Sequence, residues 1–229
     1  MGKLRNKLKK NKVLRNLYHK LLNLTPQKIY FNKNLRKVVE FDNNHGTDFS
    51  GRIYQDELGT TKERANDYSP SPDKLIKCLE KMNINSSDSI VDMGCGKGYA
   101  MYIMSGFAFG KIGGVELSTK LCNTAKNNLK KMMPSECSWE VFNCDAGKWD
   151  KYDDYNIFYL YNPFPKEVLI EVKRLMEDSI KRKKRKVLVL YLMPRCAEVF
   201  LEDSVNWKLI KRGTIFEQKR GMNIFENNI

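Results

Sequence analysis

A carboxylate and three glycines follow one another closely in the stretch SIVDMGCGKGYA at residues 89–100. The apolar run contains Asp92, and Gly94, Gly96 and Gly98 come after it at alternate positions. Glycine permits positive φ and close approach of the backbone to a ligand, so this spacing predicts a ligand-binding turn. A carboxylate ahead of the first glycine repels a pyrophosphate but attracts a cation. The stretch therefore favours a ligand with a cationic group over a dinucleotide, whose turn has the spacing GxGxxG.

Strands and helices alternate around this turn. Apolar segments predict strands at 89–93, 111–117, 138–143, 155–162 and 185–193. Amphipathic segments between them predict helices at 69–82, 97–108, 118–133 and 165–184, of which Ser71-Pro72 and Ser118 should start two. The tail at 206–226 predicts a hairpin that bends at 211–213 or at 219–221. This order predicts an α/β fold, a doubly wound and mostly parallel sheet with an antiparallel strand at its edge, which binds ligands beyond the carboxyl ends of its strands.

The motifs VDMGCGKG and GGVELS resemble the first two motifs of the class I S-adenosylmethionine-dependent methyltransferases. The resemblance implies a Rossmann-like sheet of seven strands and S-adenosyl-L-methionine as the cofactor. It implies that Asp92 and the three glycines line the cofactor and that Glu116 accepts hydrogen bonds from the two ribose hydroxyls, a task that suits the two oxygens of a carboxylate. It further implies that Asp145, in NCDAGKW, accepts a hydrogen bond from the adenine amino group.

The fourth strand ends in Asn162-Pro163-Phe164-Pro165. This sequence is similar to the (Asn/Asp)-Pro-Pro-(Tyr/Phe) motif of methyltransferases that modify amino groups of bases or glutamine side chains, although its aromatic ring comes one position earlier. The resemblance implies that Asn162 and the following carbonyl orient an acceptor nitrogen, with Phe164 beside it. The alternative interpretation is an Asn-Pro turn that only closes the strand.

Two segments upstream, FDNNHGTDFSGRI and DYSPSP, resemble the lead-in of a group of bacterial methyltransferases of this class that carry an Asn-Pro-Phe motif. The resemblance implies that Thr47, Asp48 and Tyr68 fold over the cofactor as a lid; the alternative is a loop whose glycines make turns. His19 and His45 are isolated, so we expect neither a metal site nor a catalytic histidine.

The net charge of +14 belongs to two short segments. Residues 1–20 carry eight basic side chains and no acid, and KRKKRK at 181–186 carries six; removing them leaves 27 basic residues against 27 acidic ones. Leucines at helical spacing predict a basic amphipathic helix at 1–24, which could contact an anionic membrane surface, bind an acidic partner or pack on its own domain. Nucleic-acid binding through these segments is a further alternative.

We therefore divide the chain into the helix at 1–24, a linker or lid at 25–67 and a methyltransferase domain at 68–229. Six scattered cysteines and the lack of an apolar leader or a long apolar run predict a cytoplasmic protein. The favoured function is methyl transfer to a nitrogen of a small molecule or a protein side chain. The alternatives are a nucleic-acid methyltransferase and a non-catalytic protein that binds the cofactor or is tethered to a membrane. The oligomeric state is not predicted.

Overall fold

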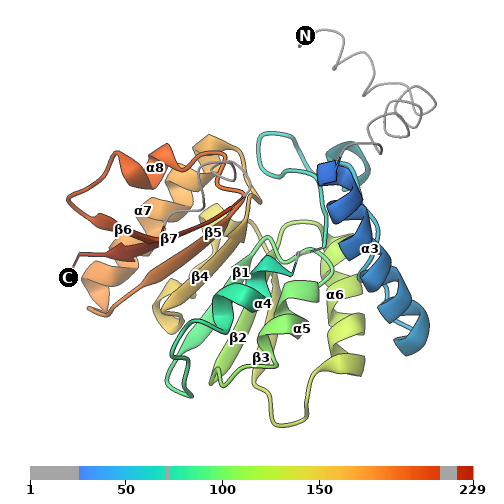
Figure 1. Ribbon diagram of the computed structural model, residues 1–229. Coiled ribbons are helices and arrows are strands. Elements are labelled where there is room, and N and C mark those ends of the chain that lie inside the picture. The colour runs from blue at the N-terminus through green and yellow to red at the C-terminus, as the bar shows by residue number, and fades with distance from the viewer. Residues whose placement is uncertain (1–25, 71–72, 212–220, 229) are drawn as a thin grey trace, which may run out of the picture.

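The computed structural model describes residues 26–70, 73–211 and 221–228 and forms one seven-stranded sheet with helices on both faces (Figure 1). The strand order is β3-β2-β1-β4-β5-β7-β6. Five parallel strands are followed along the chain by a C-terminal hairpin: β1 (Ser89–Met93), β2 (Lys111–Glu116), β3 (Trp139–Asn143), β4 (Ile157–Tyr161), β5 (Leu188–Leu192), β6 (Trp207–Lys211) and β7 (Met222–Asn227). The predicted fold class is confirmed.

The position of the antiparallel strand differs from the prediction. β7 is antiparallel to both β5 and β6 and lies between them, so it is second from the edge and β6 forms the edge. The first four residues of β7, at 222–225, are all buried, so the strand is covered on both faces. In β6, by contrast, Lys208 and Lys211 are exposed. A strand buried on both faces belongs inside a sheet, and lysines protect an exposed edge.

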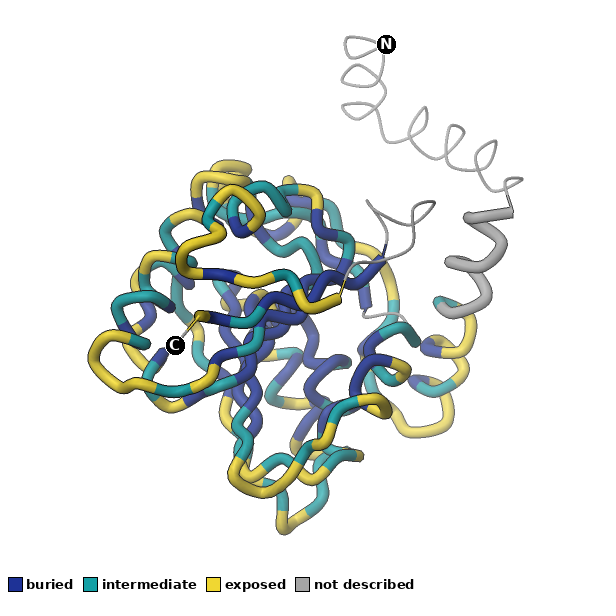
Figure 2. Tube along the Cα trace, turned by 60° about the vertical axis from the view of Figure 1, so that its left-hand side comes forward, coloured by how far each residue is buried: buried dark blue, intermediate teal, exposed yellow. Residues whose placement is uncertain are grey.

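Two helical layers enclose the sheet. The layer on one face consists of α4 (Lys74–Leu79), α5 (Tyr99–Met104) and α6 (Thr119–Met132). The layer on the other consists of α7 (Lys166–Arg182), the short α8 (Glu198–Leu201) and the 3-10 turns η2 (Ala146–Lys148) and η3 (Tyr152–Asp154). In α6 the buried residues recur at the spacing of one helical face, with Cys122, Ala125 and Leu129 turned to the sheet. The central strands are accordingly buried throughout, and exposed residues lie in the surrounding loops (Figure 2).

A long helix, α3 (Pro26–His45), precedes the sheet and begins with proline, which suits the first helical position. Its Phe41 ring packs 5.1 Å from the Tyr102 ring of α5 and 6.1 Å from Phe49. After α3 the chain runs through residues 46–70, here called the covering segment, which contains the 3-10 turn η1 (Gln55–Glu57). The aromatic contacts hold the start of this segment beside α5.

Three sequence predictions fall outside the described residues: the helix at 1–24, the helix start at Ser71-Pro72, and the bend of the hairpin between β6 and β7. Ser118 does precede α6, but its hydroxyl donates to Leu58 O at 2.9 Å and does not cap the helix. Among the helices of the described ranges, none combines the length and apolar character of a membrane span.

Candidate active site

The glycine turn joins β1 to α5 at the carboxyl end of the sheet. Gly94, Gly96 and Gly98 have φ angles of +89°, +56° and +88°, which L side chains rarely adopt. The Gly94 N–H donates to Val115 O at 2.8 Å and so ties the turn to β2. Because Gly98 is left-handed, α5 begins only at Tyr99, two residues later than the sequence predicted.

Close packing is a second reason for glycine at two of these positions. A Cβ on Gly94 would lie 2.5 Å from Pro163 Cβ, and a Cβ on Gly96 would overlap the Tyr68 ring. The turn after β4 and the end of the covering segment thus both rest on the glycine turn. Three motifs that are far apart in the sequence meet at one point.

Glu116 and Asp92 are carboxylates buried at the ends of β2 and β1, with exposed fractions of 7% and 3%. Glu116 Oε2 accepts from Gly96 N–H at 2.9 Å, and Oε1 accepts from Ser118 N–H at 2.7 Å. Burial raises the pKa of Glu116 in spite of these bonds, and burial together with the charge of Glu116 raises the pKa of Asp92 to about 8. Within the described part of the chain neither carboxylate has an ion-pair partner, so this end of the site suits a ligand with cationic and hydroxyl groups.

Asp145 follows β3 and caps the turn η2, its Oδ1 accepting from Gly147 N–H at 2.8 Å. The Arg64 guanidinium binds both carboxylate oxygens, with Nε at 2.8 Å from Oδ2 and Nη2 at 2.5 Å from Oδ1. Burial raises the pKa of Asp145, but the hydrogen bonds from Arg64 and Gly147 outweigh it and leave the pKa below its ordinary value. Asp145 is therefore an ionised carboxylate that already has protein donors.

The Asn162-Pro163-Phe164-Pro165 turn is held by the covering segment. Asn162 has a φ of +44°, a left-handed conformation that asparagine tolerates better than most residues. Asn66 donates its side-chain Nδ2–H to Asn162 O and its backbone N–H to Pro163 O, both at 3.0 Å. Phe164 is 8% exposed and packs into the core beneath α7. Among the described residues no group hydrogen-bonds the side-chain amide of Asn162, whereas Pro163 O has one acceptor position occupied.

Polar contacts anchor the covering segment at its start. Asp42 of α3 accepts from the Thr47 hydroxyl and from Ser50 N–H, each at 2.7 Å. Lys97, a buried residue of the glycine turn, donates to Asp48 Oδ1 at 2.5 Å and to Ser50 O at 2.8 Å. Thr47 and Asp48 thus anchor the segment and do not line the cavity below it.

A cavity opens between the covering segment and the carboxyl ends of β1, β2, β3 and β4. The predicted residues that line it are Tyr68, Gly94, Gly96, Glu116, Asp145, Pro163 and Phe164. Asp92, Gly98 and Asn162 are not among the lining residues. Sequence reasoning missed Arg64 and Asn66, which line the cavity from the covering segment; the glycine of NCDAGKW was the one local signal for Arg64, as shown below.

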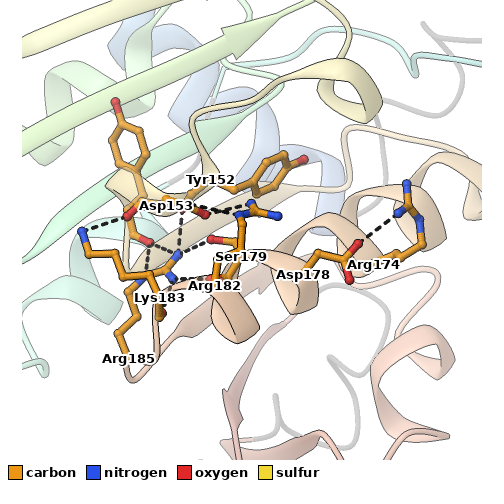
Figure 3. A network of polar contacts seen from close by, with 9 residues as sticks. Tyr152, Asp153, Arg174, Asp178, Ser179, Arg182, Lys183 and Arg185 are labelled. Carbon is orange, nitrogen blue, oxygen red and sulfur yellow. Dashed lines mark hydrogen bonds and ion pairs between the residues drawn. The ribbon is translucent and has the colours of Figure 1, made fainter.

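The basic run at 181–186 lies at the other end of the sheet, between the end of α7 and the start of β5. Arg182 Nε and Nη2 donate to the Asp153 carboxylate at 3.1 and 2.9 Å, and Arg185 Nη2 donates to Tyr152 O at 2.7 Å (Figure 3). These two arginines fasten α7 to η3. These contacts give the two arginines a structural role, and neither arginine lines the cavity.

The chain was compared with known families, proteins and structures. It matches the family model of protein-L-isoaspartate(D-aspartate) O-methyltransferase over residues 9–163, and no curated protein sequence matches it. The methyltransferase domain of a bacterial protein described as CtHen1-C is 16% identical with a TM-score of 0.50, covering 68% of this chain and 96% of that one. A protein in the NADB-Rossmann superfamily from Streptococcus agalactiae is 8% identical with a TM-score of 0.51, covering 69% of each chain. The two structures share the fold.

The fold, the glycine turn and the family match define a class I S-adenosylmethionine-dependent methyltransferase. The chain belongs to the protein-L-isoaspartate(D-aspartate) O-methyltransferase family. The class predicted from the sequence is confirmed, and the subgroup with the Asn-Pro-Phe motif stays a prediction.

Proposed function

We propose that this methyltransferase modifies a nitrogen of a small molecule or of a protein side chain. The observation that carries the proposal is the contact between the glycine turn after β1 and the Asn162-Pro163-Phe164-Pro165 turn after β4. Pro163 packs on Gly94 of the glycine turn, and the adjacent Asn162 has a side-chain amide that no other described residue binds. An amide oxygen beside a cofactor pocket can accept a hydrogen bond from an amine and so orient its lone pair.

The residues fit the cofactor. Glu116 uses two acceptor positions for backbone N–H groups, and since a carboxylate offers about four, it can also accept from two ribose hydroxyls. Asp145 would accept from the adenine amino group, and Asp92, whose pKa burial raises to about 8, would ionise near the cationic amino-acid moiety and so favour it. Tyr68, Gly94 and Gly96, which line the cavity, would lie at the methionine end. When bound, S-adenosylmethionine supplies a methyl group that its sulfonium already activates.

The chain then has little acid or base chemistry to perform. Asn162 would orient a neutral acceptor amine toward the cofactor site while the covering segment excludes water, and this positioning would be the chain's main contribution to the rate. A nearby carboxylate or solvent would take the proton that the acceptor nitrogen loses once it carries the methyl group.

A second candidate is methyl transfer to a carboxylate oxygen. Its support is the family, whose description names an O-methyltransferase of isoaspartyl and D-aspartyl residues in proteins. In that case the acceptor is an anion and has no N–H for Asn162 to bind. The two candidates give products of different stability, since esters hydrolyse in mild base and methylamines do not.

The test is to incubate the protein with S-adenosylmethionine labelled in its methyl group and with cell extract from the source organism. We expect label that stays in the product after mild base treatment and that is absent with Glu116→Ala. Release of the label as volatile methanol would favour the carboxylate, and label confined to nuclease-sensitive material would favour nucleic acid. Binding of S-adenosylhomocysteine with no label transferred to any fraction would support a non-catalytic cofactor-binding protein.

Two expectations from the sequence also stay proposals: a cytoplasmic location and peripheral contact of residues 1–24 with an anionic membrane. Cosedimentation with vesicles of phosphatidylserine and phosphatidylcholine tests the second. Equal binding by the full chain and by a chain that lacks residues 1–24 would contradict it.

A further inference from the structure

Arg64 joins three separate parts of the molecule. It lies in the covering segment, in a turn where Arg64 N–H donates to Thr61 O at 3.1 Å. Its Nε and Nη2 bind Asp145 after β3, and its Nη1 lies 3.1 and 2.8 Å from the two carboxylate oxygens of Glu171 in α7. A guanidinium is planar and rigid, so binding in this bidentate manner fixes the orientation of Asp145.

The sequence around Asp145 is adapted to this contact. A Cβ on Gly147 would lie 2.7 Å from Arg64 Nη2 and would overlap the Glu171 carboxylate. Gly147 is not among the described glycines with positive φ, so backbone conformation does not require glycine there. The ends of the Glu171 and Arg64 side chains occupy the space that a Cβ would take.

The contact with Arg64 leaves the Asp145 carboxylate with an acceptor position for a ligand. Oδ1 accepts from Arg64 Nη2 and Gly147 N–H, whereas Arg64 Nε is the one donor to Oδ2 among the described residues. A carboxylate has about four acceptor positions, so one position on Oδ2 is available to a ligand. Arg64 and Asp145 both line the cavity, with side chains 26% and 17% exposed, and a ligand there meets an oriented acceptor.

We propose that Arg64 is a positioning residue for cofactor recognition: it aims Asp145 at the adenine amino group and at the same time fastens the covering segment over the cavity. The inference rests on the proposed role of Asp145 in the cofactor pocket. It makes selectivity for an adenine amino group and closure of the covering segment depend on one side chain.

The test measures binding by calorimetry, without any acceptor, for S-adenosylhomocysteine and for S-inosylhomocysteine, in which a carbonyl oxygen replaces the amino group. The wild type should prefer the adenine form by about tenfold or more, the value of one hydrogen bond to a charged group. Arg64→Gln should weaken S-adenosylhomocysteine binding by about tenfold and lose most of this preference. Hydrogen exchange at residues 61–66 should slow on ligand binding in the wild type and much less in Arg64→Gln.

Matched variants control for loss of folding and of charge. Gly147→Ala should reproduce the loss of preference, because it occupies the space of the guanidinium while leaving Arg64 and Asp145 in the chain. Arg174→Gln removes an exposed pair with Asp178 on α7 (Figure 3) and should bind both compounds as the wild type does.

An Arg64→Gln protein that binds as tightly as the wild type, or more tightly, and keeps the same preference would overturn the inference while the cofactor pocket stands. Tighter binding would mean that Arg64 competes with the cofactor for Asp145. A folded wild type that binds neither compound would overturn the proposed pocket and this inference together.

Discussion

Replacing Asp92 by asparagine should stabilise the protein and weaken its cofactor binding. Asp92 is 3% exposed and lies in β1, in register with Gly114 of β2 and Tyr159 of β4. Burial, and then the charge of Glu116, raises its pKa to about 8 from the ordinary 3.8. Asparagine has almost the same shape and carries no charge, so Asp92→Asn removes the cost of the buried anion and leaves the packing unchanged.

The size and sign of the effect follow from the two pKa values. Below about pH 4 the carboxyl is neutral in the folded and unfolded chains, and it costs nothing. Between about pH 4 and pH 8 the unfolded chain releases the proton and the folded chain keeps it, so each pH unit removes about 1.4 kcal/mol of folding stability. At pH 7 the wild type should therefore be less stable than Asp92→Asn by up to about 4 kcal/mol.

The assay is urea unfolding of the wild type and of Asp92→Asn without ligand. It is run at about pH 4.5, 6, 7 and 8, values that span the range between the two pKa values. The two free energies of unfolding should lie within about 1 kcal/mol at pH 4.5 and diverge as the pH rises. At pH 7 Asp92→Asn should bind S-adenosylhomocysteine more weakly, because an asparagine cannot ionise in response to the cationic amino group of the ligand. A stability difference that does not change with pH, or a less stable Asp92→Asn protein, would refute the reasoning.

Three further predictions concern the same site and the basic run. Because Asp92 is mostly protonated at pH 7 and would ionise beside the cofactor, S-adenosylhomocysteine binding should release up to one proton, seen by calorimetry in buffers of different ionisation enthalpy and absent in Asp92→Asn. Asn162→Gly keeps the left-handed turn and removes the amide, so it should lose turnover but not cofactor affinity, whereas Asn162→Ala should also lose about 1 kcal/mol of stability; full turnover by Asn162→Gly would reduce the motif to a turn. Arg185→Met should cost about 2–3 kcal/mol in urea unfolding by leaving buried carbonyls unpaired, and Lys184→Met should cost less than about 0.5 kcal/mol; an equal effect of the two would contradict a structural role for Arg185.

Most of the fold was predictable from local patterns. Apolar runs located β1 to β5, and the alternation of strands with amphipathic helices implied a parallel sheet whose ligand lies at the carboxyl ends of the strands. The glycines at 94, 96 and 98 were identified as a turn because only glycine readily adopts such φ angles. Glu116 and Asp145 were identified through the resemblance to methyltransferase motifs, in which these residues stand at or shortly after the ends of the second and third strands. In all of these the signal and the structure lie within a few residues of each other.

What the sequence left open depends on contacts between distant residues. Gly147 marks space beside Asp145, but nothing in the sequence indicates that Arg64, 81 residues earlier, is the residue that fills it, nor that Asn66 occupies the carbonyl of Pro163. β7 lies between β5 and β6 because it is the strand that is buried on both faces, and this burial is a property of the assembled sheet. Lys97 similarly appears in the sequence as one more residue of the glycine motif, and only the fold turns it toward Asp48. The sequence by itself determined most of the strands and helices and the glycine turn, because backbone conformation and strand ends are local. Tertiary structure decided which of those groups are free to meet a ligand, because that depends on partners the chain brings together only when it folds.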